Sequence, residues 1–242
     1  MCLVRTLKSG PIPEAVVAAG QAEAMDRMYR VQRHIYDLTR RFYLLGRDRL
    51  LRGLPVQPGA SVLDLGCGTG RNLIRLSRLR PDLRLCGVDA SAAMLETARV
   101  KIGRAGIGRA EGGTAQACRL ACCLAEDLDP ARDLDRDLGQ GFDAVYFSYV
   151  LSIIPEPAAA MDAAWALVRP GGVLAVVDFG DFARLPAWFG RMLRAWLALF
   201  GVRPKPEVGA RLQAMAEAEG AELVREDHCR GYAVLYWLRK AG

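Results

Sequence analysis

The sequence predicts an α/β protein with a doubly wound, mostly parallel β-sheet. Three observations predict this class: short apolar runs alternate with helical segments, the first run leads into a glycine-rich turn, and two strand patterns near the C-terminus are joined by a short turn. The short turn implies antiparallel pairing at one edge of the sheet. With 242 residues, 52% of them hydrophobic, the chain can bury the core of one substantial domain.

Each predicted strand is a short apolar run, as expected for strands that are buried on both faces of a parallel sheet. The first run leads into the glycines, the second ends in Asp89, the fourth ends at Ser148 and the fifth leads into Asp178. The last two strands flank the turn at residues 229–231 and form a hairpin. The seven predicted strands cover residues 62–65, 83–88, 121–125, 142–148, 172–177, 221–227 and 232–238.

Helical patterns fill most of the intervals between the strands, and Ser91 is placed to cap one of these helices. A further helical stretch precedes the first strand, over residues 25–54, whereas the glycine- and alanine-rich residues 103–117 are expected to be a loop or a frayed helix end. We therefore divide the chain into an N-terminal helical extension or lid (1–55) and an α/β domain (56–242). The predicted helices of the α/β domain cover residues 71–79, 91–102, 156–167 and 184–200.

The glycine-rich loop after the first predicted strand carries the strongest functional signal. Gly66, Gly68 and Gly70 occupy alternate positions and let the backbone turn tightly against a ligand, so that side chains there would occupy ligand space. Asp64 precedes the loop, and Asp89 ends the second strand, where its carboxylate would reach ribose hydroxyls. These residues indicate a nucleoside cofactor, with an NAD site or a purely structural glycine turn as the alternatives.

The run Asp-Leu-Gly-Cys-Gly-Thr-Gly at residues 64–70 resembles motif I of the class I S-adenosylmethionine-dependent methyltransferases. Dinucleotide sites favour the spacing G-x-G-x-x-G instead. The resemblance implies a Rossmann-like, seven-stranded sheet, S-adenosyl-L-methionine as the cofactor, and an acidic residue that holds the cofactor's ammonium group. The cofactor-binding residues expected from it are Asp64, Gly66, Cys67, Gly68, Gly70, Asp89, Ala90, Ala125, Glu126 and Ser148.

The adenine end of the site departs from the family pattern. The family carries a sequence like Asp-Ala-x-x-Leu after the third strand, but the acidic position is Leu124 here, which cannot accept a hydrogen bond from the adenine amino group. The Ala125 amide can still address the ring, and Glu126 or Asp127 can substitute for the missing acid. The alternative is that both acids are solvated loop residues.

Composition and charge argue against several other classes. No apolar run approaches the roughly 20 residues of a membrane span, and no long apolar signal segment follows Met1, so we expect a cytoplasmic chain. The seven cysteines are odd in number, as in a reducing compartment, and with two histidines and no paired C-x-x-C a metal site is not expected. The net charge of +6 suits an anionic membrane surface; without an RNA-binding signature, nucleic acid is not an expected partner.

A narrower resemblance extends from about residue 24 to the C-terminus. The segments Tyr-Asp-Leu-Thr-Arg (36–40), Gly-Arg-Asp-Arg (46–49), 147–155 and 177–181 resemble the N-methyltransferases of betaine lipid synthesis. This resemblance implies trimethylation of diacylglyceryl-homoserine to diacylglyceryl-trimethylhomoserine, with the enzyme that makes diacylglyceryl-homoserine as a functional partner. The alternatives are a phosphatidylethanolamine N-methyltransferase, a small-molecule methyltransferase and a non-catalytic methyltransferase-like binding module.

The segment 184–200 is predicted to be an amphipathic helix. Its Trp, Phe, Leu and Met residues occupy one half of the helical wheel, and Arg184, Arg191 and Arg194 lie on the other. This pattern is typical of a helix that lies in a lipid headgroup region, and it also suits a helix that covers the sheet or closes an active site. We expect it to bind the enzyme peripherally to the inner face of the membrane, with the lid as the alternative.

Methyl transfer from a sulfonium to an amine is an in-line displacement, so the protein must mainly align the reacting atoms. Polar groups of the N-terminal stretch and of the end of the fourth strand are expected to orient the amine, although an aromatic core stripe also explains the N-terminal tyrosines. Arginines can bind a homoserine carboxylate in bidentate fashion. The candidate catalytic residues are Tyr36, Asp37, Ser148 and Tyr149, and the candidate substrate-binding residues are Arg47, Tyr149, Arg230 and Tyr232.

Overall fold

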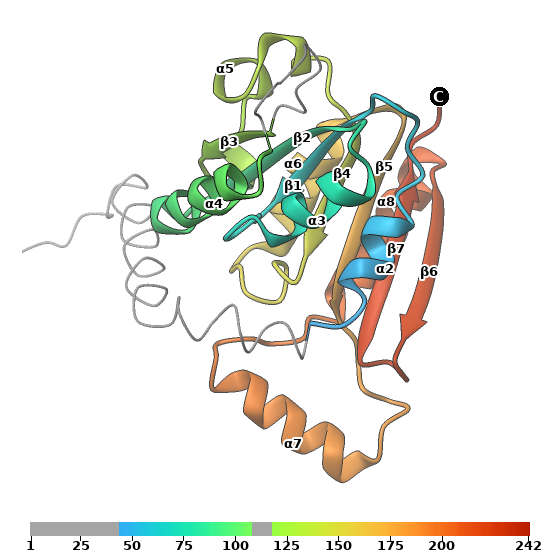
Figure 1. Cartoon of the computed structure of the whole chain (residues 1–242). Helices are drawn as coiled ribbons and strands as arrows, with labels where there is room; N and C mark the ends of the chain where they lie inside the picture. Colours follow the sequence, from blue (N-terminus) through green and yellow to red (C-terminus); the bar gives the residue numbers. More distant parts are fainter. Residues whose placement is uncertain (1–43, 108–117) are drawn as a thin grey trace, which may run out of the picture.

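The structure is a computed structural model that describes residues 44–107 and 118–242, which form a doubly wound α/β fold around one seven-stranded sheet (Figure 1). The strand order is β3-β2-β1-β4-β5-β7-β6; β1 to β5 pair in parallel, and β7 is antiparallel to both of its neighbours. The predicted fold class is confirmed. The strands are β1 (Ser61–Leu65), β2 (Arg84–Asp89), β3 (Cys118–Cys122), β4 (Phe142–Ser148), β5 (Val168–Phe179), β6 (Glu222–His228) and β7 (Ala233–Arg239).

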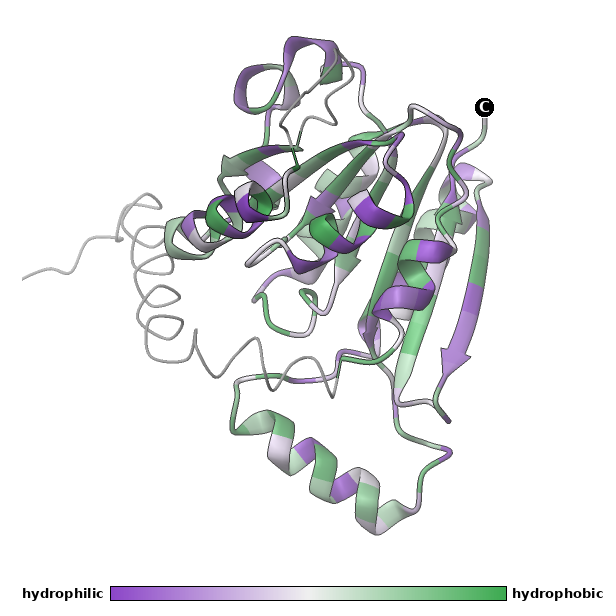
Figure 2. Cartoon of the chain, viewed as in Figure 1, coloured by the Kyte–Doolittle hydropathy of each residue, from purple (hydrophilic) through white to green (hydrophobic). Residues whose placement is uncertain are grey.

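Helices cover both faces of the sheet and bury a separate apolar layer on each. Leu50, Leu73 and Leu95, from α2, α3 and α4, pack on one face, and Met161 and Leu212, from α6 and α8, pack on the other. The central strands are correspondingly hydrophobic along most of their length (Figure 2). The helices are α2 (Arg47–Arg52), α3 (Arg71–Leu79), α4 (Ala92–Arg104), α5 (Pro130–Asp133), α6 (Pro157–Ala166), α7 (Ala187–Ala198) and α8 (Glu207–Glu219), with short 3-10 turns η1 (Ala125–Asp127) and η2 (Arg136–Leu138).

The C-terminal hairpin agrees with the sequence prediction. Cys229, Arg230 and Gly231 join its two strands with φ angles of 51°, 59° and 77°. Left-handed backbone conformations of this kind reverse the chain within a few residues. The outer strand β6 carries exposed charged residues along the edge of the sheet, which disfavours pairing with other chains.

The third strand lies three residues earlier than the predicted range 121–125. β3 ends at Cys122, and Leu124 already precedes the turn η1. The prediction was wrong because β3 is an edge strand with exposed side chains at Arg119 and Cys122, so it lacks the continuous apolar run of a central strand. Helix α8 was also missed, although Leu212, Met215 and its other buried residues recur at helical spacing.

The described part of the N-terminal segment is not one continuous helix. Residues 25–43 of the predicted helical stretch lie outside the described residues, and α2 begins only after Gly46, whose φ angle is 81°. Leu50 and Leu51 of α2 belong to the same core as Val62 of β1. The chain therefore shares one core across the predicted boundary at residue 55, and the lid function stays a prediction.

Candidate functional site

The glycine loop connects β1 to α3 at the carboxyl edge of the parallel strands. Gly66, Gly68 and Gly70 have φ angles of 75°, 55° and 76°, a region that favours glycine. The amides of Gly66 and Cys67 donate hydrogen bonds of 2.8 and 2.9 Å to the carbonyl of Val88 and so attach the loop to β2. The Cys67 side chain is buried in the core, and this burial raises the pKa of its thiol well above the usual range. Only the backbone of Cys67 lines the loop.

The three glycines serve different purposes. A Cβ at Gly66 would lie 2.4 Å from a methyl group of Val150, and a Cβ at Gly70 would lie 3.2 Å from the Cβ of Ala98. These two glycines let the loop pack closely against its own protein. A Cβ at Gly68 would meet no described atom within 4 Å, so Gly68 faces open space that a ligand can enter. The expectation that a side chain at Gly66 would occupy ligand space is therefore corrected.

Two alanine substitutions should separate these roles. Gly66→Ala should destabilise the fold by about 2 to 4 kcal/mol, because a strained φ angle is combined with a clash against Val150. Gly68→Ala should cost only about 1 kcal/mol and should lower the affinity for S-adenosyl-L-methionine about ten-fold or more, because the added methyl group occupies ligand space. Thermal denaturation and calorimetric titration measure the two effects. If Gly68→Ala binds the cofactor with wild-type affinity, the ligand does not occupy the open space next to Gly68.

Asp64 lies on β1, directly before the loop, and its side chain is fully buried. Neither carboxylate oxygen accepts a hydrogen bond of ordinary geometry from the described residues, although the Tyr146 hydroxyl lies close enough to influence the carboxylate. Burial raises the pKa of Asp64 to about 7, against the opposing effect of the neighbouring Tyr146 hydroxyl on β4. A buried carboxylate without a partner is costly, and a cation relieves that cost. The site thus fits the ammonium group of S-adenosyl-L-methionine.

Asp89 ends β2 and holds the glycine loop in place. One carboxylate oxygen accepts a 2.8 Å hydrogen bond from the Gly68 amide, and the other accepts a 2.9 Å bond from the Ser91 amide. Each oxygen has a second lone pair, so Asp89 can also accept from ribose hydroxyls. Ala90 lies between these anchored residues, and Ser91 caps α4 by accepting from the Met94 amide at 3.3 Å, as predicted.

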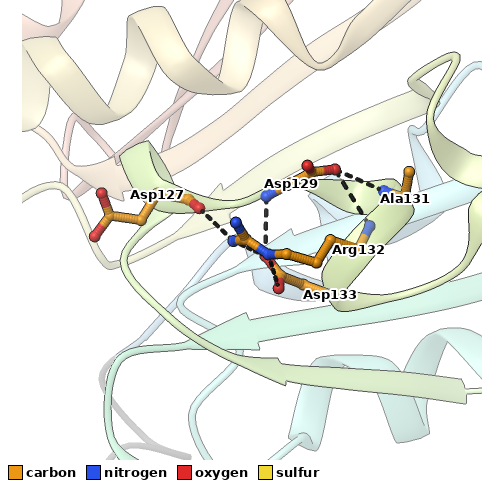
Figure 3. A network of polar contacts seen from close by, with 5 residues as sticks. All are labelled: Asp127, Asp129, Ala131, Arg132 and Asp133. Atoms are coloured by element: carbon orange, nitrogen blue, oxygen red, sulfur yellow. Dashed lines mark hydrogen bonds and ion pairs between the residues drawn. The ribbon is translucent and has the colours of Figure 1, made fainter.

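The segment after β3 has no acid at the position where the family pattern has one. Glu126 is exposed, and Ala125 is half-buried. The next residues are fixed by a polar network in which Arg132 binds the Asp133 carboxylate at 2.7 Å and the Asp127 carbonyl at 3.3 Å, while the Asp127 side chain points away (Figure 3). The Asp127 carboxylate is therefore an exposed loop acid in this structure, as the alternative interpretation of the sequence expects. Adenine binding by Ala125 and Glu126 stays a prediction.

The end of β4 lies at the switch point of the sheet, where β1 is flanked by β2 on one side and by β4 on the other. The Ser148 hydroxyl is buried there and has no hydrogen-bond partner among the described residues. Tyr149 follows with a φ angle of 60°, and its hydroxyl donates to the carbonyl of Leu45. Tyr149 therefore ties the N-terminal segment to this edge, and its orienting role stays a prediction.

The other predicted site residues lie in three environments. Arg47 is buried and donates to the Leu44 carbonyl at 3.1 Å. Arg230 is exposed in the hairpin turn. Tyr232 is buried with its ring centroid 5.9 Å from that of Phe179 and 5.7 Å from that of Phe182. Tyr36 and Asp37 lie outside the described residues.

Comparison with known proteins gives the same class of domain as the loop and the fold. Residues 63–174 match a family model described as a methyltransferase domain. The chain is 30% identical over 171 residues to a trans-aconitate 2-methyltransferase of Methylobacterium radiotolerans, which covers 69% of this chain and 56% of that protein. It is 52% identical over 99 residues to a carboxy-S-adenosyl-L-methionine synthase of Campylobacter fetus, over 41% of this chain and 35% of that protein.

The fold is similar to that of a solved O-methyltransferase family protein from Burkholderia thailandensis, with a TM-score of 0.57 and 20% identity over 91% of this chain and 60% of that chain. The chain spans about half the length, or less, of the curated relatives described above. The sheet topology, the glycine loop and the match over residues 63–174 together support a methyltransferase domain of the class I, S-adenosylmethionine-dependent kind. The methyltransferase match agrees with S-adenosyl-L-methionine, the cofactor that the glycine loop predicts.

Proposed function

We propose that this chain methylates the amine of a lipid headgroup, and that the lipid is diacylglyceryl-homoserine, which becomes diacylglyceryl-trimethylhomoserine. The observation that carries this proposal is helix α7, which exposes large apolar side chains beside the end of the sheet where the cofactor loop lies. The resemblance of several sequence segments to the N-methyltransferases of betaine lipid synthesis supports the choice of lipid.

Helix α7 follows the carboxyl end of β5 and stands off from the sheet (Figure 1). Its apolar half is divided between two environments. Leu193 and Leu197 are buried against the domain, whereas Trp188, Met192 and Leu199 are 63%, 52% and 80% exposed. The buried side chains agree with a helix that covers the fold. The exposed side chains agree with a helix that contacts a membrane.

The outward face of α7 also carries positive charge. Arg191, one helical turn after Trp188, is exposed, and Figure 2 shows hydrophilic and hydrophobic residues alternating along this helix. Aromatic and aliphatic side chains next to arginines suit a headgroup layer, in which apolar groups enter the lipid and guanidinium groups meet anionic lipids. Within the described residues, no helix is long and apolar enough to cross a membrane.

The chain's own residues have limited chemical tasks in this reaction. When bound, S-adenosyl-L-methionine supplies an electrophilic methyl group, which only an unprotonated amine can accept. Asp64 would hold the ammonium end of the cofactor, Asp89 its ribose, and the backbone at Gly68 would leave room between them. The buried Ser148 hydroxyl would accept a hydrogen bond from the acceptor amine in the first two transfers, because the dimethylated amine has no N–H left to donate. Alignment of this kind supplies much of the acceleration of a displacement reaction.

Two other acceptors compete with homoserine lipid. Phosphatidylethanolamine also presents an amine at a membrane surface and would use α7 in the same way. A soluble carboxylate is the second class of candidate, because relatives of this chain are named as trans-aconitate methyltransferases. A soluble acceptor gives no reason for the exposed residues of α7, and for that reason we favour the lipid.

Acceptor competition tests the proposal directly. The purified chain is incubated with methyl-labelled S-adenosyl-L-methionine and equal amounts of diacylglyceryl-homoserine, phosphatidylethanolamine and trans-aconitate. We expect label in the lipid phase, in mono-, di- and trimethylated homoserine lipid. Label in trans-aconitate would refute the lipid proposal, and label in phosphatidylethanolamine alone would refute the choice of headgroup.

A further inference from the structure

A cavity of about 630 Å³ lies on the α8 face of the sheet, at the carboxyl end of β5. Strands β6 and β7, helices α7 and α8 and the segment before α8 contribute to its lining. The residues of the glycine loop are not among those that line it. The lining of the cavity is therefore separate from the cofactor loop.

An acidic side chain lies at the sheet end of this cavity. Asp178 follows Val177, which pairs with Ser148, the last residue of β4. The Asp178 carboxylate is buried and accepts hydrogen bonds from the amides of Phe179 at 2.8 Å and Ser152 at 3.0 Å. Burial raises the pKa of Asp178 to about 6. Asp178 thus places a carboxylate at the carboxyl end of β5, at the sheet end of the cavity.

Two cations line the cavity and form no ion pair with a carboxylate among the described residues, although the charge of Lys205 lies close enough to Asp178 to oppose the rise of its pKa. The Lys205 ammonium donates to the carbonyl of Ile154 at 2.5 Å, and the Arg194 guanidinium donates to the carbonyl of Asp181 at 2.9 Å. A third cation, Arg225, forms an ion pair of 2.9 Å with Asp227, which is not part of the cavity lining. Hydrogen bonds to neutral carbonyls leave the positive charge of Lys205 and Arg194 available to an anion.

Much of the remaining wall of the cavity is apolar, and the polar side chains of Asp181, Gln213 and Tyr236 also line it. Phe179, Val208, Leu223 and Val234 contribute to the apolar part. Apolar walls with a few charged groups of both signs are typical of sites for amphipathic molecules. The ligand class that matches this lining carries an amine and an anionic group on a short aliphatic stem.

We propose that this cavity receives the zwitterionic headgroup of the acceptor, with its amino group toward Asp178 and its carboxylate between Lys205 and Arg194. The inference rests on the proposed function and names residues for it that the sequence does not single out. Arg194 belongs to α7, so the same helix would contact the lipid surface and help to bind the headgroup.

Lys205 provides the cleanest test. Lys205→Gln keeps a donor for the Ile154 carbonyl but removes the charge, and Lys205→Arg restores the charge. Arg211→Gln is the control, because Arg211 is an exposed α8 residue that pairs with Asp162 at 2.6 Å and is not part of the cavity lining. Initial rates with diacylglyceryl-homoserine micelles give KM and kcat, and calorimetry gives the affinity for S-adenosyl-L-methionine.

We expect Lys205→Gln to raise KM for homoserine lipid about ten-fold, through loss of a charge-assisted contact, and to leave cofactor affinity unchanged. Lys205→Arg and Arg211→Gln should retain the wild-type KM. The lipid whose headgroup carboxylate is converted to an amide should be a poorer acceptor for the wild type by a similar factor, but not for Lys205→Gln.

The possible outcomes separate the two proposals. If the wild type methylates homoserine lipid and Lys205→Gln keeps its KM, the cavity assignment is overturned and the proposed function stands. If the wild type does not methylate the lipid, the proposed function fails and the assignment fails with it. A loss of cofactor affinity in Lys205→Gln that equals the change in KM would also overturn a headgroup site.

Discussion

Replacing Asp64 with asparagine is expected to abolish tight cofactor binding and, at the same time, to stabilise the protein without cofactor at pH 8. The loss of binding should be on the order of 100-fold or more, because a buried charge partner for the ammonium group is removed. The gain in stability follows because the wild type must keep an ionised carboxylate in an apolar site, whereas the amide is neutral.

The raised pKa of Asp64 determines in which direction the stability of the fold changes with pH. The pKa of Asp64 is about 7 in the fold, against 3.8 for an unperturbed aspartate, so between these two pH values the folded state holds a proton that the unfolded state has lost. The contribution of Asp64 to stability is therefore fully present below about pH 4, declines as the pH rises toward 7 and is lost above it. Cofactor affinity should change in the opposite direction and increase as Asp64 ionises.

Thermal denaturation and calorimetric titration of wild type and Asp64→Asn between pH 5 and pH 8 measure both effects. We expect the variant to melt higher than the wild type at pH 8, with a smaller difference at pH 5. Unchanged cofactor affinity in Asp64→Asn would contradict the role of this carboxylate. A variant that melts lower at pH 8 would contradict its burial without a partner.

The second large effect is expected at the exposed face of α7. Replacing Trp188, Met192 and Leu199 together with serine should reduce binding to anionic liposomes by about 100-fold or more, because each buried apolar side chain contributes roughly 1.5 to 3 kcal/mol. The affinity for S-adenosyl-L-methionine in solution should stay unchanged, because these side chains point away from the domain. Sedimentation with liposomes and calorimetry measure the two quantities.

Val224→Ser provides the control, because Val224 is also an exposed apolar residue, 47% accessible, but lies on the edge strand β6. It should leave liposome binding unchanged. Trp196 is less suitable than Trp188 for this experiment, because it packs against the core and its loss would also affect folding. Liposome binding by the triple variant at wild-type strength would exclude α7 as the membrane contact.

The features that the sequence predicted well are those set by local chemistry. The glycine loop, the carboxylates of Asp64 and Asp89 and the Ser91 cap follow from residue types at fixed spacing, so they could be found without any knowledge of the fold. The central strands were also found, because burial on both faces gives a continuous apolar run.

The features that were missed depend on residues far apart in the sequence. Gly66 and Gly68 look alike in the motif, and only the position of Val150 separates a packing glycine from one that faces open space. The half-exposed edge strand β3 gave a weak pattern and was placed three residues late. The cavity near Asp178 and Lys205 is assembled from several elements, and no local pattern could have indicated it.

Mass spectrometry of cellular lipids tests the central claim most directly. Cells that lack betaine lipid are supplied with diacylglyceryl-homoserine and express either the wild-type chain or Asp64→Asn. We expect diacylglyceryl-trimethylhomoserine, with its mono- and dimethylated precursors, in cells with the wild type and none in cells with the variant. Active protein that leaves the homoserine lipid unmethylated, while a soluble acid or another lipid gains methyl groups, would contradict the account.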